Sequence, residues 1–346
     1  MAAPDLAEGI DHQVAMVMDL NKCIGCQTCT VGCKTTWTEG DGKDYMYWNN
    51  VETRPGDGYP RDWESMGGGW QSAEHSQRKV GQIPSMEAYG RPWEFNYEEA
   101  LFSPEDATLR PEGESPEWGP NWDEDQGAGQ YPNSYYFYLP RICNHCTHPS
   151  CVEACPRKAL YKREEDGVVL VDQERCRGYR YCVEGCPYKK VYYNAVKNTS
   201  EKCIFCYPRI EGEGPEGEVQ APVCAAECTT QLRLVGYLDD RDGPIHTLVN
   251  QYEVALPLHP EYQTAPNVYY IPPTAPPQIN PEGETTEFAR IPRSYLEELF
   301  GEAVHDALDT LKRERQRVRR GGDSEVMDIL TSKNPANQYR LEVFQE

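Results

Sequence analysis

Fifteen cysteines, confined to two stretches of the chain, constrain this sequence more than any other feature. The first stretch has the spacing Cys-x2-Cys-x2-Cys-x3-Cys, formed by Cys23, Cys26, Cys29 and Cys33. Thiolates at this spacing can hold one iron–sulfur cube with three side chains, while the fourth reaches a different cluster. An odd number of cysteines does not complete a disulfide framework, and disulfide-rich domains are much shorter than 346 residues. The spacing therefore predicts iron–sulfur clusters.

The same motif recurs 153 residues later, with one ligand replaced. The recurring residues are Asp19, Cys23, Gly25, Cys29, Gly32 and Cys33, which become Asp172, Cys176, Gly178, Cys182, Gly185 and Cys186. Tyr179 stands where the first copy has Cys26, so we predict that Tyr179 is a non-ligand at a vacant position. The glycines are expected to allow turns with positive φ and a close approach of the backbone to inorganic sulfur.

Two further motifs use the remaining cysteines. They are Cys143-x2-Cys146-x4-Cys151-x3-Cys155 and Cys203-x2-Cys206 followed by Cys224-x3-Cys228. Four motifs of four positions, less the replaced one, account for all fifteen cysteines. The last motif taken alone could form a structural zinc site, and that alternative stays open. We expect His145 and His148 to be hydrogen-bonding neighbours rather than iron ligands.

Ferredoxin modules pair their motifs, and each motif lends its last cysteine to the other. Symmetry pairs the first motif with the fourth and nests the second and third between them. The predicted [4Fe–4S] ligand sets are the Cys23 site (Cys23, Cys26, Cys29, Cys228), the Cys33 site (Cys33, Cys203, Cys206, Cys224) and the Cys143 site (Cys143, Cys146, Cys151, Cys186). The Cys155 site retains Cys155, Cys176 and Cys182. Three thiolates suit a [3Fe–4S] cluster, although ligation by the Tyr179 phenolate remains a minor alternative.

The expected fold class is α+β, with two nested ferredoxin-like modules that together hold four clusters, long irregular insertions and a C-terminal helix. Residues 12–38 and 196–240 would form the first module, and residues 136–195 the second. Residues 39–135 would form a partner-facing insertion, and residues 241–346 an extended Pro-rich arm ending in the helix. Short apolar runs predict strands at Val14–Met18 and Val168–Val171.

The predicted C-terminal helix follows a capping box formed by Ser294 and Glu297. Apolar residues then recur at helical spacing from Leu296 to Leu311, and basic residues follow near the C-terminal end. This helix could pack on its own domain or dock on a partner, and the pattern does not choose between the two.

The charge and hydrophobic content of the chain limit the classes of partner that it can bind. The net charge of −22 and the lack of a basic aromatic stripe exclude nucleic acid, and they favour a halophilic protein whose dense carboxylates keep it hydrated. Only 38% of the residues are hydrophobic, and no apolar run approaches the roughly 20 residues of a membrane span. The acidic N-terminal segment is not expected to act as a secretory signal.

The chain resembles the iron–sulfur beta subunits of the nitrate reductase (type II) branch of the dimethyl sulfoxide reductase family. The resemblance rests on the cysteine scaffold, on CRGYRYC from Cys176 to Cys182, on CPYKKVYYN from Cys186 to Asn194, and on the Pro-rich stretch that ends at Ile271-Pro-Pro. In that family an aromatic residue, commonly tryptophan, stands at the position of Tyr179 beside a [3Fe–4S] cluster. Formate dehydrogenase subunits look similar but keep all sixteen cysteines.

The resemblance implies a non-catalytic electron-transfer subunit of an anaerobic respiratory complex. Its partners would be a molybdenum catalytic alpha subunit with a bis-molybdopterin guanine dinucleotide (bis-MGD) cofactor and a membrane partner that carries haem b or oxidises quinol. The cluster that uses Cys228 would lie nearest molybdenum, and the [3Fe–4S] cluster farthest away.

Nitrate is the expected substrate of the complex, and acidity points to a haloarchaeal member of the group. Dimethyl sulfide or ethylbenzene dehydrogenases and selenate or (per)chlorate reductases are alternatives, as is an autonomous polyferredoxin. The complex is expected to be membrane-associated, on the extracytoplasmic face after co-export with a twin-arginine partner, with a cytoplasmic position as the alternative.

Overall fold

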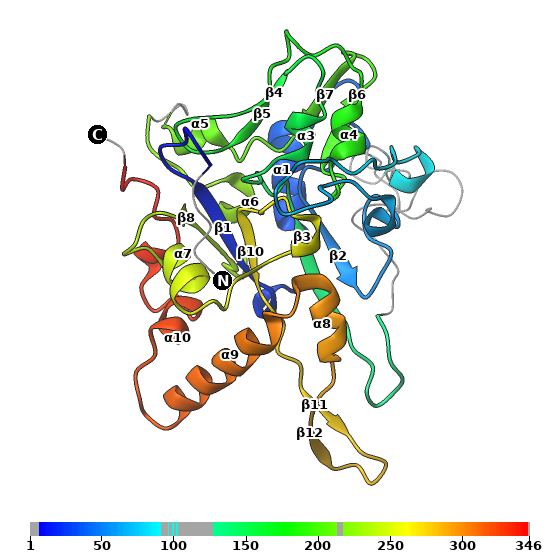
Figure 1. Cartoon of the computed structure of the whole chain (residues 1–346). Helices are drawn as coiled ribbons and strands as arrows, with labels where there is room; N and C mark the ends of the chain where they lie inside the picture. Colours follow the sequence, from blue (N-terminus) through cyan, green and yellow to red (C-terminus); the bar gives the residue numbers. More distant parts are fainter. Residues whose placement is uncertain are drawn as a thin grey trace.

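The central sheet joins strands from distant parts of the chain (Figure 1). The computed structural model describes residues 7–90, 127–212 and 217–344, together with Asn96, Glu99 and Phe102. The sheet has the order β8 (Arg233–Tyr237), β1 (Val14–Asp19), β10 (Val268–Ile271) and β9 (Leu256–Pro257). Strand β1 is parallel to β10 and antiparallel to β8. Every residue of β1 is buried, as its nearly continuous apolar sequence predicts.

The Pro-rich region after residue 241 is part of the core, and its interpretation as an extended arm outside the core is wrong at β10. Four consecutive residues of β10 are buried, and Val268 pairs with Met16 of β1. The prolines lie on either side of β10, at Pro266 and Pro272, so they do not remove hydrogen bonds from its interior. Composition suggested an arm because pairing with a strand some 250 residues away leaves no local signal.

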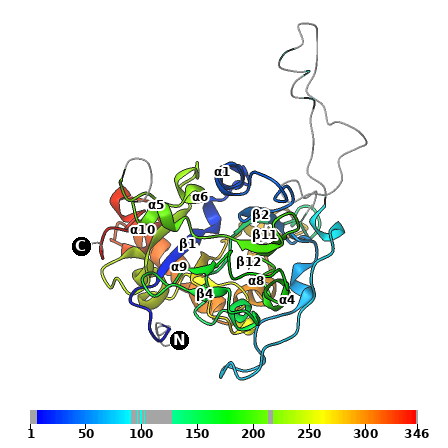
Figure 2. The ribbon, with the colours of Figure 1, turned by 90° about the horizontal axis from the view of Figure 1, so that it is seen from above.

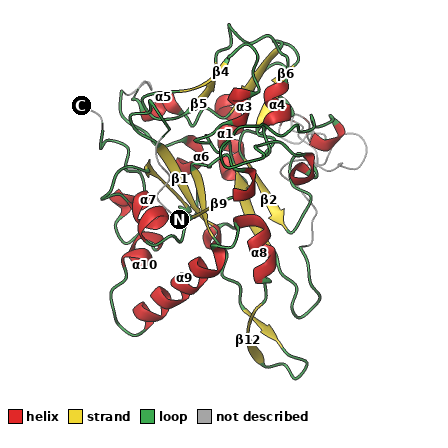
Figure 3. Ribbon diagram, viewed as in Figure 1, coloured by secondary structure: helices red, strands yellow, loops and turns green. Residues whose placement is uncertain are grey.

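In the described part of the chain, four two-stranded ribbons and several short helices accompany the sheet, and the ribbon that contains β12 projects from one end of the molecule (Figure 3). The ribbons are β2 (Asn50–Arg54) with β3 (Phe137–Arg141), β4 (Leu160–Lys162) with β5 (Val169–Val171), β6 (Val191–Asn194) with β7 (Thr199–Lys202), and β11 (Pro277–Ile279) with β12 (Thr285–Ala289). The helices are α1 (Thr28–Trp37), α3 (Ser150–Glu153), α4 (Tyr181–Gly185), α5 (Tyr207–Ile210), α6 (Val223–Ala226), α7 (Pro244–His246), α8 (Arg293–Phe300), α9 (Val304–Arg319) and α10 (Glu325–Leu330). Both predicted strands are confirmed, as β1 and β5, and the mixed content agrees with an α+β fold.

The predicted C-terminal helix is two helices, α8 and α9 (Figure 1). Gly301, with φ 75°, ends α8, because glycine enters this conformation without the penalty that a Cβ imposes. Pro292 precedes α8, and Ser294 lies inside the helix, so the predicted capping box is wrong. Buried side chains on α8 and α9, including Phe300 and Val304, belong to the core of the chain. These helices therefore pack on their own domain.

Two pairs of short helices carry cysteines from different motifs. Helix α1 packs against α6, and the two lie side by side in Figures 1 and 2. Helix α3 packs against α4. A Cβ added at Gly32 of α1 would lie 3.2 Å from the Val223 side chain of α6, and one at Gly185 of α4 would lie 3.0 Å from Ala154 next to α3. Both repeated glycines thus allow close approach between helices.

The described part of the insertion packs on the chain itself. Trp70 donates a hydrogen bond from Nε1 to the His148 carbonyl at 3.0 Å, and Arg78 pairs with Glu184 at 3.2 Å. Trp63 is fully buried, and it lies in a 3₁₀ turn of this segment. The predicted partner-facing insertion covers residues 39–135, and most of its positions 91–126 lie outside the described residues.

Candidate iron–sulfur sites

The Cys33 site is a buried cavity with four cysteines in its wall. These cysteines are Cys33, Cys203, Cys206 and Cys224. Two of these sulfurs accept hydrogen bonds, from Trp37 Nε1 to Cys206 Sγ at 3.2 Å and from the Phe205 backbone to Cys203 Sγ at 3.4 Å. Helices α1 and α6 supply one cysteine each, and the loop after β7 supplies two.

The Cys143 site is a second cavity of the same kind. Its wall contains Cys143, Cys146, Cys151 and Cys186. The first three come from the loop after β3 and from α3, whereas Cys186 follows α4. The cavity therefore lies where α3 packs on α4, just as the Cys33 site lies where α1 packs on α6.

The Cys23 site lies at the other end of α1. Burial, together with the nearby thiols of Cys29 and Cys228, raises the pKa of the Cys23 thiol to about 12. Asn49 Nδ2 donates a hydrogen bond to Cys29 Sγ at 3.3 Å. Cys26 is exposed, and its sulfur lies 3.6 Å from the hydroxyl of Thr229, the residue after Cys228. The structure thus brings these four cysteines to one region.

The Cys155 site contains three thiols. Burial raises the pKa of Cys182 to about 12, and the thiols of Cys155 and Cys176 contribute to the rise. Ser200 joins two of them, because its backbone N–H donates to Cys176 Sγ at 3.4 Å and its hydroxyl lies 3.2 Å from Cys182 Sγ. The Tyr179 side chain is 57% exposed and stands at the surface beside this site.

The repeated motifs share a backbone turn. Gly25 and Gly178 have φ of 68° and 67°, as predicted, and a Cβ at Gly25 would lie 2.7 Å from the Tyr138 ring. Gln27 and Arg180 also have positive φ, at 58° and 64°, and each directly precedes a helix. We did not predict these two residues, although the repeat places them at equivalent positions.

The polar atoms of the cavity walls fit iron–sulfur clusters. Trp48 Nε1 in the Cys33 site and His145 Nε2 in the Cys143 site are buried without a hydrogen-bond partner. His145 Nδ1 accepts the Val169 backbone N–H at 3.1 Å, so in the neutral ring Nε2 carries the proton. Cluster sulfurs accept hydrogen bonds. Each cavity thus combines four thiols with an N–H donor that has no partner within the described part of the chain.

Comparison with known proteins supports iron–sulfur sites in this chain. Residues 134–238 match the model of a 4Fe-4S dicluster domain. The chain is 75% identical to the respiratory nitrate reductase subunit beta of Haloferax mediterranei over 99% of its own length and 97% of the relative. It is 58% identical to the dimethylsulfide dehydrogenase subunit beta of Rhodovulum sulfidophilum, over 96% and 99% of the two chains. A more distant relative, at 35% identity, is the respiratory nitrate reductase 2 beta chain of Escherichia coli, over 97% and 85%.

The chain belongs to the nitrate reductase beta-subunit family. Members of this family are iron–sulfur electron-transfer subunits, so the predicted family and its general function are confirmed. None of the fifteen cysteines of this beta subunit forms a disulfide bond. Within the described ranges, no group of three or more His, Cys, Asp or Glu side chains is arranged to hold a single metal ion.

Among the described helices of this beta subunit, none combines the length and the apolar character that crossing a bilayer requires.

Burial governs the chemistry of the thiols in this beta subunit. It raises the pKa of Cys203 above its ordinary value, and it raises the pKa of Cys146 and Cys224 to about 12. Such thiols stay protonated at neutral pH unless a cation replaces the proton. Iron is a cation of this kind, and thiolate is its usual ligand in iron–sulfur clusters. The donor set and its environment therefore fit the cofactor.

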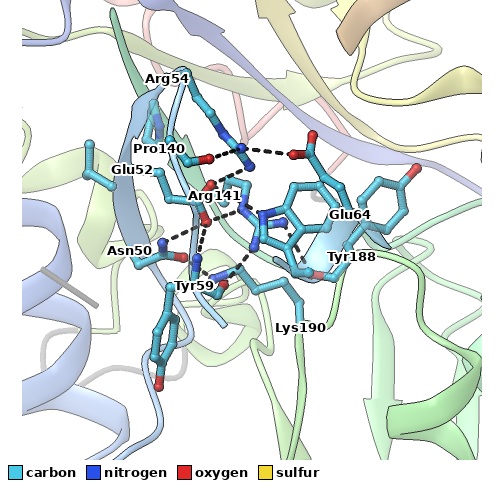
Figure 4. A network of polar contacts seen from close by, with 12 residues as sticks. Asn50, Glu52, Arg54, Tyr59, Glu64, Pro140, Arg141, Tyr188 and Lys190 are labelled. Atoms are coloured by element: carbon cyan, nitrogen blue, oxygen red, sulfur yellow. Dashed lines mark hydrogen bonds and ion pairs between the residues drawn. The ribbon is translucent and has the colours of Figure 1, made fainter. Parts of the chain in front are cut away.

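Figure 4 shows a buried ionic network that was not predicted from the sequence and that reaches the Cys143 site through Lys190. Glu52 accepts a hydrogen bond from Arg141 Nε at 2.6 Å and forms an ion pair with Arg54 Nη2 at 2.9 Å, and all three side chains are almost completely buried. Lys190 binds Asn50 in the same network and also lines the Cys143 site. Burial alone would raise the pKa of Glu52, but the three cations lower it to about 2. The network thus fixes β2 to β3, directly before Cys143.

Proposed function

We propose that this beta subunit holds three [4Fe–4S] clusters and one [3Fe–4S] cluster. The [4Fe–4S] clusters would occupy the Cys23, Cys33 and Cys143 sites, and the [3Fe–4S] cluster would occupy the Cys155 site with Tyr179 as a non-ligand. The observation that carries this proposal is the pair of cavities whose walls each contain four cysteines from two motifs. The surface position of Tyr179 and the three grouped thiols support the incomplete fourth site.

The two nested ferredoxin-like modules form part of the same proposal. One would comprise residues 12–38 and 196–240, and the other residues 136–195. The contacts of α1 with α6 and of α3 with α4 support this pairing, because each contact joins the motifs that the proposed modules combine. Residues 39–135 and 241–346 would be additions to the modules.

The bound clusters would supply single-electron transfer. The residues of this chain hold the thiolates, exclude water and donate hydrogen bonds to sulfur, as Trp37 and Asn49 do. We assign no substrate site to the subunit. Electrons would pass between a molybdenum bis-MGD catalytic subunit and a haem b or quinol-oxidising membrane partner. The names of the relatives, which are subunits of reductases and dehydrogenases, support this role over that of an autonomous polyferredoxin.

Nitrate is the proposed substrate of the complex. The support is the 75% identity to the Haloferax mediterranei nitrate reductase subunit, against 58% to the dimethylsulfide dehydrogenase subunit. We propose a membrane-associated complex on the extracytoplasmic face, reached by co-export with a twin-arginine partner, with a cytoplasmic position as the alternative. Assays of the purified complex with nitrate, selenate, chlorate and dimethyl sulfide would test the substrate. A complex that acts on one of the other compounds but not on nitrate would reject nitrate as the substrate.

Electron paramagnetic resonance of the purified complex tests the cluster assignment. Cys155→Ala and Cys182→Ala should each abolish the [3Fe–4S] signal, and Tyr179→Cys should convert that site to [4Fe–4S]. Tyr181→Phe is the matched control, because Tyr181 is also an exposed aromatic in the same motif. Full [3Fe–4S] signals in both alanine variants would reject the assignment. Iron analysis should return about fifteen atoms per subunit.

A further inference from the structure

A fully buried arginine, Arg233, lies between the Cys33 and Cys23 sites. It begins β8 and pairs with Met18 of β1. Its Nη2 donates to Asn49 Oδ1 at 2.7 Å, and its Nη1 lies 3.7 Å from Met16 Sδ. Met16 and Asn49 both line the Cys33 site. Asn49 also donates to Cys29 Sγ at 3.3 Å, so one guanidinium contacts the walls of two sites.

The charge of Arg233 has no carboxylate partner among the residues that the structure describes. Its Nε is buried and makes no hydrogen bond. Arg54 and Arg141 are equally buried, but both pair with Glu52. A buried charge is costly unless an opposite charge or a metal site compensates it. The compensation for Arg233 must therefore come from another kind of anionic group.

Cysteines of the two sites lie close to Arg233, and they become anionic thiolates when they bind iron. Burial alone would lower the pKa of Arg233, but the thiols of Cys224 and Cys29 raise it, followed by those of Cys228 and Cys23. Cys224 belongs to the Cys33 site, and the other three belong to the Cys23 site. Arg233 thus faces thiols of both sites.

We propose that Arg233 is a counter-cation shared by the Cys33 and Cys23 clusters, and that it raises the reduction potentials of both. This inference rests on the proposed function. A cluster held by four thiolates is negatively charged, and reduction adds one more negative charge. A cation in a medium of low dielectric constant stabilises the reduced form more than the oxidised form. The Cys155 site does not share this cation.

The buried position of Arg233 is important because the chain has a net charge of −22. At about 1 M salt the Debye length is roughly 3 Å, so surface cations act only over short distances. Buried charges are screened much less. Arg233 can therefore favour reduction of two clusters in an acidic protein even where salt suppresses the effect of surface charge.

Redox titration of the purified complex, followed by electron paramagnetic resonance, tests the proposal. Arg233→Met removes the charge, and Arg233→Gln removes the charge but keeps a donor for Asn49. Either variant should lower the reduction equilibrium constants of both clusters at least tenfold, which is about 59 mV for a one-electron couple. Arg233→Lys keeps the charge and should retain most of the wild-type potential. The Cys143 and Cys155 clusters provide internal standards.

Arg340→Met is the matched control, since Arg340 bonds to Val235 of the same strand but pairs with Asp240 near the surface. It should leave all four potentials unchanged. Wild-type potentials of the two clusters in whichever neutral variant assembles would overturn the proposal, as would an equal drop in Arg233→Lys. Equal shifts of all four clusters would do the same. Missing cluster signals in the wild-type complex would instead reject the proposed function.

Discussion

Glu52→Gln removes the only carboxylate that binds both Arg54 and Arg141 within the described part of the chain. The pKa of Glu52 is about 2, against an ordinary value of 4.5. Since a pKa difference of one corresponds to about 1.4 kcal/mol, the network stabilises the ionised carboxylate by about 3 kcal/mol. Breaking a buried ion pair typically costs about 3–5 kcal/mol, which agrees. We therefore expect the variant to lose about 3 kcal/mol of unfolding free energy at pH 7.

The stability that Glu52 contributes depends on pH, because folding lowers the pKa of its carboxyl group. A carboxylate whose pKa is lowered in the folded state stabilises that state above its unfolded pKa. The contribution should be complete above about pH 4.5 and lost as the pH falls towards 2. Between about pH 4.5 and pH 2, the Glu52→Gln variant should therefore lose less unfolding free energy than the wild type.

Urea unfolding of the purified complex, followed by tryptophan fluorescence and cluster absorbance, measures the effect. Trp63 reports on the network directly, because the Arg141 guanidinium lies 3.6 Å from its ring centroid. Asp328→Asn is the control, since its pair with Lys333 at 3.0 Å is exposed and should contribute at most about 1 kcal/mol. If Glu52→Gln cost no more than this control, the electrostatic reasoning would be refuted.

Three further predictions concern single side chains. Burial alone would lower the pKa of His259, but hydrogen bonds to two glutamates raise it above 6.5, so its stabilisation should be complete below pH 6.5 and decline as the pH rises through the folded value. Melting curves of His259→Gln should therefore approach those of the wild type at alkaline pH. Trp37→Phe removes a donor 3.2 Å from Cys206 Sγ and should lower the potential of the Cys33 cluster in a redox titration. Gly25→Ala should lower the melting temperature more than Gly9→Ala, because both glycines have positive φ but only Gly25 has a side chain within 4 Å of the added Cβ.

Local patterns predicted elements whose determinants lie within a few residues. The apolar run at Val14 is a strand, and the repeated glycines adopt positive φ. The same reasoning was wrong for the C-terminal helix, where apolar spacing continues across Gly301 although the backbone turns there. It was also wrong for β10, because a strand that pairs with the other end of the chain needs no local signal.

The cysteine spacing by itself predicted the kind of cofactor, because ligands a few residues apart must bind the same or neighbouring metals. The family came from a resemblance that rests on the cysteine motifs together with the residues around them. The spacing also led to ligand sets that remain predictions until spectroscopy tests them. Only the tertiary structure revealed which cations lie beside the sites. Arg233 and Glu52 are ordinary charged residues in the sequence, and whether a charge is buried, paired or facing thiols depends on chain segments far from it. Electrostatic energy depends on distance and burial in space, which residue order does not specify.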